Sequence, residues 1–273
     1  MMAQSFQRTI YGVSTAVSLA LAASAALADQ PLPNLTNLNF TSYTGSSPKN
    51  YFGSVDPVGW TGGSGLIFID STTIPNAQAA SPVYLTTYAN PVGSYSGNYV
   101  EADGNPNYES GFNYTVTGLK VGETYTLSFY QGASQQTGFD GLTTNQWIVG
   151  LGTAGLSRTL YTGYALYSDA DPSASIAASP LMTIPSGTAV GWDYVSVNLT
   201  ADATTDILSF LAWGDNGNTA NLPPIAFLAG VNSPPGLGVG SVPEPASMAL
   251  FAVGLLGLGG IARRRRKKHS LPN

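Results

Sequence analysis

The sequence predicts an all-β fold, an antiparallel two-sheet sandwich of the jelly-roll type, flanked by an N-terminal signal peptide and one C-terminal transmembrane helix. Short runs in residues 29–232 alternate apolar with polar side chains, which is the pattern of half-buried strands. Turn residues separate these runs, and no stretch between them has helical periodicity. About eight to ten short strands spaced in this way are typical of a sandwich.

The clearest strand is 124–129, in which three apolar side chains share one face and three hydroxyl side chains share the other. Residues 112–116 alternate in the same way, and Gly118 and Gly122 bracket the turn between the two runs. We therefore expect these two strands to pair as a hairpin. Further strands are predicted at 194–199, 207–213 and 224–231, and weaker ones at 66–70, 83–88, 98–102, 146–151 and 181–184. The run 207–213 is apolar on both faces, as expected for a central strand.

The N-terminus has the features of a secretory signal peptide. Arg8 precedes an apolar run, residues 10–27, and the small residues Ala26 and Ala28 form the end of the segment. This order is typical of a peptide that signal peptidase removes. We expect residues 1–28 to be cleaved, so the exported domain is 29–232.

The exported part of the chain is strongly acidic. Three basic residues (Lys49, Lys120 and Arg158) lie between residues 29 and 242 against fourteen acidic ones, a net charge of −11, whereas the whole chain carries −5. This balance argues against nucleic acid and anionic lipid surfaces as partners. The chain has no cysteine, so the domain has no disulfide and depends on its core, for which its length suffices.

Three features follow one another near the C-terminus. Pro243, Glu244 and Pro245 precede an uncharged apolar stretch, 246–262, and a basic cluster follows it at 263–268. The cluster consists of Arg263, Arg264, Arg265, Arg266, Lys267 and Lys268. As a helix the apolar stretch would be about 26 Å long, at the short end of what spans a bilayer core. By the positive-inside rule, the basic end is cytoplasmic and the domain lies on the opposite side of the membrane.

This order of features resembles the PEP-CTERM sorting signal of Gram-negative bacteria that secrete exopolysaccharide. The resemblance implies that a membrane-embedded exosortase recognises residues 243–268 and cleaves near Pro-Glu-Pro. The protein would first be held in the inner membrane, facing the periplasm, and then be passed to the cell surface or extracellular matrix. We expect it to associate there with the exopolysaccharide of a biofilm. Residues 233–242, rich in proline and glycine, would be a spacer. An ordinary C-terminal membrane anchor is the alternative.

Few catalytic groups are available in the exported domain. Its sequence has no histidine, because His269 in the tail is the single one in the chain. This excludes Ser-His-Asp and Cys-His catalysis and imidazole-bound metals from the domain. The carboxylates Glu101, Asp103, Glu109 and Glu123 could supply the acid and base of a glycoside hydrolase or lyase. Because acidic side chains are usual in solvated loops, we expect a non-enzymatic protein.

Two short turns carry the oxygen ligands that calcium prefers. They are Asp103-Gly104-Asn105 and Asp215-Asn216-Gly217-Asn218. Calcium takes about six to eight oxygen ligands, and neither turn matches a complete calcium loop of about twelve residues. Asp and Asn are also common turn formers because they bond their own backbone. A structural calcium ion held at either turn, by Asp103 and Asn105 or by Asp215 and Asn218, is the cofactor that this pattern suggests.

Aromatic residues beside amides and carboxylates indicate a carbohydrate site, because sugars stack on rings while polar groups bind their hydroxyls. Trp213 closely followed by Asp215 and Asn216 is the best local combination, with Gln131 and Trp147 second. Aromatic residues in a sandwich also serve as core or cross-strand partners. A structural role is therefore the alternative for each ring.

The strand pattern around Gly59-Trp60, 68–70, 97–104 and 116–129 resembles the galactose-binding-like jelly-roll modules of surface proteins. The similarity extends over residues 35–231. It implies carbohydrate binding and, in many members, a structural calcium ion. It rests on pattern and assigns no binding residue to this chain.

Overall fold

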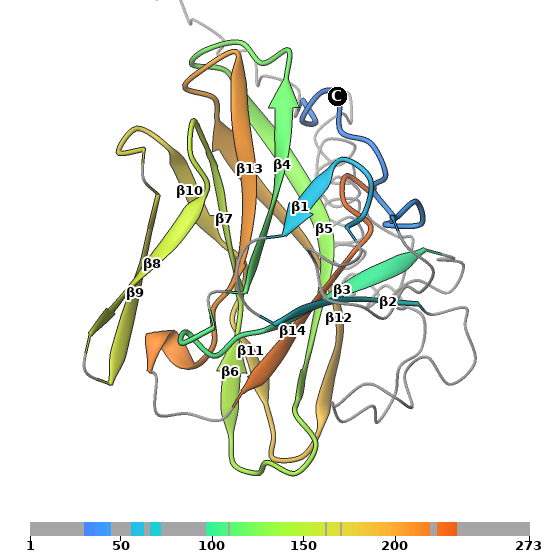
Figure 1. The fold of residues 1–273 in the computed structure, drawn as a ribbon, viewed down its shortest axis with the longest axis vertical. Helices are drawn as coiled ribbons and strands as arrows, with labels where there is room; N and C mark the ends of the chain where they lie inside the picture. Colours follow the sequence, from blue (N-terminus) through green and yellow to red (C-terminus); the bar gives the residue numbers. More distant parts are fainter. Residues whose placement is uncertain are drawn as a thin grey trace, which may run out of the picture.

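The computed structural model describes residues 30–44, 56–62, 66–71, 97–108, 110–161, 163–169, 171–218 and 223–233. In these residues the fold is a sandwich of two antiparallel five-strand sheets, which confirms the all-β prediction (Figure 1). The predicted signal peptide, the strand at 83–88, most of the spacer and the tail lie outside the described residues. Among the residues described, no helix is long and apolar enough to cross a membrane.

The first sheet has the order β1 (Trp60–Gly62), β4 (Gly111–Thr117), β13 (Thr205–Ala212), β7 (Trp147–Gly152) and β10 (Ser175–Ala178). The predicted central strand is confirmed, because β13 pairs with β4 on one side and β7 on the other. Its two faces serve different clusters. Leu208 and Phe210 join the main core, whereas Leu211 packs with Ile148 and Trp213 on the other face.

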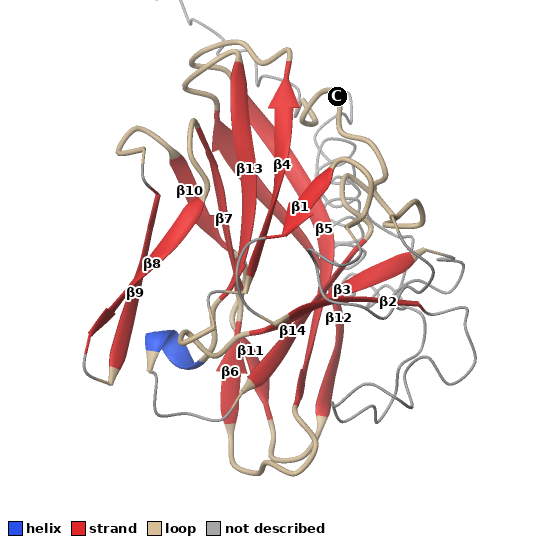
Figure 2. Cartoon of the chain, viewed as in Figure 1, coloured by secondary structure: helices blue, strands red, loops and turns tan. Residues whose placement is uncertain are grey.

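The second sheet has the order β12 (Ala189–Thr200), β5 (Thr124–Gln135), β14 (Pro224–Ala229), β3 (Asn98–Asp103) and β2 (Ile67–Ser71). Two short pairs complete the described strands: β6 (Thr143–Asn145) with β11 (Met182–Ile184), and β8 (Leu156–Tyr161) with β9 (Tyr164–Asp169). A 3₁₀ turn, η2 (Asp215–Gly217), follows β13 and lies near the β8–β9 hairpin (Figure 2).

Aromatic side chains fill the space between the sheets. Phe112 of β4 stacks on Phe210 of β13, with ring centroids 5.1 Å apart. Phe129 of the second sheet meets the same Phe210 ring edge-on at 5.4 Å, and Trp60 packs against Phe112 at 5.4 Å. These residues are fully or almost fully buried, so their burial and edge-to-face contacts supply much of the packing energy of a domain without disulfides.

The predicted hairpin of 112–116 with 124–129 is wrong. Strand β4 pairs with β1 and β13, whereas β5 pairs with β12 and β14, so the two strands lie in different sheets. The runs 112–116 and 124–129 are each apolar on one face, and each buries that face against the same core from opposite sides. Gly118 and Gly122, both at φ 79°, allow the chain to cross between the sheets.

Candidate functional site

Two of the predicted polar turns meet at a pair of glycines. The Gly214 N–H donates to the Gly104 carbonyl at 2.6 Å, and the Gly104 N–H donates to the Pro224 carbonyl at 2.7 Å. A Cβ on Gly214 would lie 2.6 Å from the Gly104 oxygen and 2.5 Å from Pro224 Cγ, so only glycine permits this approach. Residues 103–108 and 213–218 therefore lie side by side, and we call them the paired loops.

Side chains and unusual backbone angles shape the paired loops. Asp103 Oδ1 accepts the Asn105 N–H at 2.7 Å, and Asn105 Oδ1 accepts the Asn107 N–H at 3.0 Å. In the second loop Asp215 and Asn216 have φ values of 41° and 53°. Successive left-handed residues other than glycine are uncommon and occur often at functional sites. Asn216 is exposed, and its side chain is available to a ligand.

The Asp103 carboxyl lies at the inner end of the paired loops and is only 2% exposed. Burial raises its pKa from 3.8 to about 7, although the hydrogen bond from the Asn105 N–H lowers it. Near neutral pH this carboxyl is therefore partly protonated, whereas an exposed aspartate is ionised. It could accept a cation or donate a proton to a ligand.

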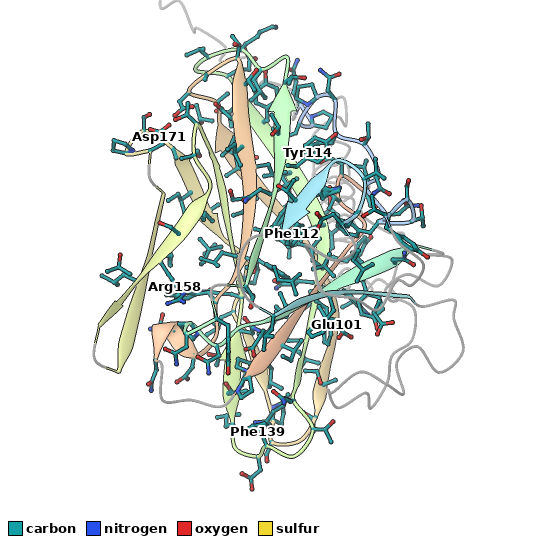
Figure 3. All side chains as sticks on the ribbon, viewed as in Figure 1. Glu101, Phe112, Tyr114, Phe139, Arg158 and Asp171 are labelled. Carbon is teal, nitrogen blue, oxygen red and sulfur yellow. The ribbon has the colours of Figure 1, made fainter. Side chains whose placement is uncertain are left out.

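The β8–β9 hairpin is the third part of the chain that contributes to the site, beside the two paired loops. Arg158 of β8 donates through Nη2 to the Asn107 carbonyl at 2.7 Å. Figure 3 shows Arg158 between this hairpin and the main body of the sandwich. Because Arg158 is one of three basic residues between residues 29 and 242, it brings a rare positive charge to an acidic surface. Sequence reasoning did not assign it to the site, since it lies about fifty residues from either loop.

Trp213 is a buried residue whose ring packs beneath the surface of the site. Its side chain is 3% exposed, and its ring packs edge-on against Tyr167 of β9 with centroids 5.2 Å apart. The ring therefore positions Tyr167 and the hairpin. The ring with the most exposure in the paired loops is Tyr108, at 46%. Tyr108 is one of many tyrosines in the domain, and the sequence did not single it out as a binding residue.

Gln131 and Trp147 lie apart from the paired loops. Trp147 is in the main core, where Nε1 donates to the Phe227 carbonyl at 3.0 Å. Gln131 is fully buried on β5 and donates through Nε2 to the Pro180 carbonyl at 2.9 Å. Their predicted role in carbohydrate binding stays a prediction, without a place in the site assembled here.

The outer face of the second sheet carries a group of aromatic residues that sequence reasoning missed. Tyr99 packs edge-on against Trp192 at 5.7 Å and against Phe227 at 5.9 Å. Tyr99 and Glu101 alternate along β3 with Val100 and Ala102, which face the core, so both faces of the strand are buried.

The carboxylates considered for hydrolysis do not all lie together. Glu101 and Asp103 share one face of β3 at a two-residue spacing. The register places Glu101 opposite Phe227 and Phe227 opposite Gly132, so Glu123, just before β5, lies about 30 Å away along the strand. Glu109 is outside the described residues. Of the four carboxylates considered, Glu101 and Asp103 are therefore the pair that the described residues place close together.

Among the described residues, no group of three or more His, Cys, Asp or Glu side chains could hold a metal ion. The paired loops bring Asp103 and Asn105 close to the loop of Asp215 and Asn218, which amounts to two carboxylates and two amides. Calcium accepts such ligands but is held more weakly as the number of charged ligands falls. Calcium at the paired loops stays a prediction.

Residues 241–267 match the family described as the PEP-CTERM protein-sorting motif. The chain carries a PEP-CTERM sorting motif. The resemblance seen in Pro243, Glu244, Pro245 and the basic cluster is thereby confirmed. The motif marks an exported protein sorted at the cell surface and implies processing by an exosortase. No curated protein sequence matches the chain.

Three of the solved structures that are similar in fold to this PEP-CTERM protein are the following. An α-L-arabinofuranosidase (MgGH51) has a TM-score of 0.36 and 15% identity over 72% of this chain and 25% of that one. The enzymatically active domain of bacteriophage CBA120 tailspike protein 4 has 0.33 and 10%, over 73% and 21%. The CBM22-2 xylan-binding domain of Paenibacillus barcinonensis Xyn10C has 0.32 and 15%, over 65% and 91%. The chain spans a quarter or less of the first two proteins.

Proposed function

We propose that the chain is a non-enzymatic protein of the cell surface or extracellular matrix, whose sandwich binds a neutral glycan of the exopolysaccharide. The observation that carries this proposal is the contact of the two polar loops at Gly104 and Gly214 beside the β8–β9 hairpin. That contact gathers side chains from three distant parts of the sequence on one surface. We also propose that the strands of the sandwich are connected as a jelly roll.

The chemistry of the paired loops suits a sugar. The exposed Tyr108 ring offers a face for the C–H side of a pyranose, as aromatic residues do in ligand sites. Asp215 and Asn216 supply an acceptor and a donor–acceptor for hydroxyl groups. The strongly acidic domain repels polyanions, so a neutral glycan fits better than an acidic one.

The sorting motif gives this binding a location. In the proposed sequence of events, the domain is exported, held in the inner membrane by 246–262 and released near Pro243-Glu244-Pro245 by an exosortase of a Gram-negative cell. Residues 233–242 would keep the domain clear of the membrane until then. A glycan-binding domain delivered in this way would attach to the biofilm matrix outside the cell.

The test is binding of the full chain, in mild detergent, to neutral polysaccharides extracted from the host's matrix. We expect Tyr108→Ala and Asp215→Ala to weaken binding at least tenfold while leaving the melting temperature unchanged. Tyr194→Ala is the matched control, because Tyr194 is an exposed tyrosine on β12, 37% exposed and outside the paired loops. Unchanged binding by both site variants would refute the paired loops as the binding surface.

A secreted glycoside hydrolase or lyase is the second candidate, favoured by one observation. The raised pKa of Asp103, about 7, suits a general acid, and Glu101 lies on the same face of β3. The same incubations, assayed for reducing ends and unsaturated products, separate the two candidates. Product formation that Asp103→Asn abolishes would replace the binding proposal by the enzymatic one.

A further inference from the structure

A buried aspartate, Asp206, and a half-buried one, Asp202, face each other at the opposite end of β13 from the paired loops. Asp202 lies in the turn between β12 and β13, and Asp206 is the second residue of β13 and is 1% exposed. The Asp206 Oδ2 atom accepts the Asp202 N–H at 3.2 Å. The Oδ1 atoms of both residues are buried and have no hydrogen-bond partner. An unpartnered buried carboxylate oxygen is costly, and here there are two.

The hydroxyl group of Ser173 lies beside this pair and has two carboxylate acceptors for its single proton. Ser173 Oγ lies 2.8 Å from Asp202 Oδ2 and 2.6 Å from Asp171 Oδ1. Because a hydroxyl has one proton, it cannot donate at full strength to both carboxylates. Asp171 also accepts the Ser173 N–H at 2.9 Å, so that loop is held with its hydroxyl oxygen next to Asp202. The turn thus has an excess of acceptor oxygens.

Positive charge is scarce around this pair. The turn between β4 and β5 contacts the β12–β13 turn through two hydrogen bonds. The Leu119 N–H donates to the Thr204 carbonyl at 3.2 Å, and the Gly122 N–H donates to the Ala201 carbonyl at 2.8 Å. The β4–β5 turn carries Lys120 and Glu123, which offset each other in charge, and within the described chain no ion pair reaches Asp202 or Asp206.

We propose that Asp202 and Asp206 bind a divalent cation of the calcium class, with the Ser173 hydroxyl oxygen as a further ligand. A hard cation would satisfy both unpartnered Oδ1 atoms and remove the competition for the Ser173 proton. Two carboxylates are fewer than a tight site uses, so water and backbone oxygens would complete the shell. Asp171 acts through Ser173 as a positioning residue. The site is separate from the paired loops and does not depend on glycan binding.

The cation would join two segments that are distant in sequence, the loop after β9 and the β12–β13 turn. That turn also bonds to the crossing from β4 to β5. The site would thus brace the end of the sandwich where both connections pass between the sheets. Modules outside the cell bind calcium at about 10⁻⁴–10⁻³ M, a range that suits a site with two carboxylates.

The experiment is a calcium chloride titration of the full chain in mild detergent, by calorimetry and by thermal unfolding, with EDTA as the reference. We expect saturable binding and a rise of several degrees in Tm, both lost in Asp206→Asn and in Asp202→Asn. Asp202 is only half-buried, so its variant serves if Asp206→Asn fails to fold. Without calcium, Asp206→Asn should melt above the wild type, because the repulsion is gone.

Two controls locate the ion. Asp193→Asn changes an exposed aspartate of β12 and should keep the full calcium response. Asp215→Asn removes a carboxylate of the paired loops and should also keep it. A calcium response that is absent in the wild type, or that survives in both Asp202→Asn and Asp206→Asn, would overturn the proposal. Loss in Asp215→Asn alone would move the ion to the paired loops, which also overturns it.

Discussion

The indole ring of Trp213 stands edge-on to the phenol ring of Tyr167, with centroids 5.2 Å apart and planes at 83°. This contact joins the strand end after β13 to the β8–β9 hairpin. The hydrogen bond from Arg158 to the Asn107 carbonyl joins the same hairpin to the other loop. The hairpin is a two-stranded unit with little stability of its own, so its position depends on contacts with the sandwich. These two contacts act together with the hydrogen bond from the Leu156 N–H to Ser209 Oγ at 3.2 Å.

Trp213→Ala should destabilise the domain by about 3–5 kcal/mol, because it leaves a cavity among buried residues. It should also free the hairpin and weaken glycan binding. Urea denaturation and the glycan assay measure the two effects. Trp213→Phe, which keeps a ring near Tyr167, should recover most of both. A stable Trp213→Ala variant with full binding would show that the hairpin is held by other contacts.

Asp103→Asn should remove a pH dependence of stability. The folded pKa of about 7 exceeds the usual 3.8, so the folded state binds more protons than the unfolded state between these values. Stability of the wild type should therefore fall as pH rises from about 4 to 7, by up to roughly 4 kcal/mol. The variant should lack this fall and be the more stable protein at pH 8.

The measurement for Asp103 is the free energy of unfolding in urea at several pH values from 4.5 to 8. Asn keeps an oxygen for the Asn105 N–H, so the loop is preserved. Asp193→Asn, at an exposed position, should leave the wild-type profile unchanged. Parallel profiles for wild type and Asp103→Asn would contradict the assignment of this titration to Asp103.

Gly214→Ala should separate the paired loops. A Cβ there would overlap Gly104 and Pro224, and overpacking of this kind costs about 1–3 kcal/mol. We expect a lower Tm and weaker glycan binding. Gly191→Ala is the matched control, since its added Cβ meets nothing within 4 Å. Equal Tm values for the two variants would show that the close approach at Gly214 can relax without cost.

Replacing Pro243, Glu244 and Pro245 together by alanine should block sorting. The uncleaved chain should accumulate in the inner membrane with its basic cluster attached, because the motif lies within the matched residues 241–267. Cell fractionation and mass spectrometry of the C-terminal peptide provide the readout. Pro234→Ala with Pro235→Ala, outside the motif, should leave sorting normal. Normal release of the triple variant would mean that the enzyme reads other features of the tail.

Several strands were predictable because alternation is a local property. The runs at 124–129, 112–116 and 194–199 lie within observed strands, and the run at 207–213 extends one residue beyond β13. Shorter strands were missed, namely β1, β6, β8, β9 and β10. Runs of three to six residues with few apolar positions carry too little periodic signal to separate them from loops.

Only part of the candidate site could be predicted from the sequence. Asp103, Asn105, Asp215 and Asn216 could be named because oxygen-rich turns stand out in the sequence. That these turns touch depends on Gly104 and Gly214, which are 110 residues apart, and only the packed sheets bring them together. The burial of Trp213 and the position of Arg158 have the same origin.

By itself the sequence determined where the protein goes, since a sorting motif is a linear signal read from consecutive residues 241–267. It also determined that the domain is made of strands, because side-chain alternation is set within each strand. The tertiary structure decided which strands pair with one another. Strands β4 and β5, adjacent in sequence, lie in different sheets because each can bury its apolar face only against the opposite sheet. Asp202 and Asp206 face each other because this same arrangement turns the chain between β12 and β13.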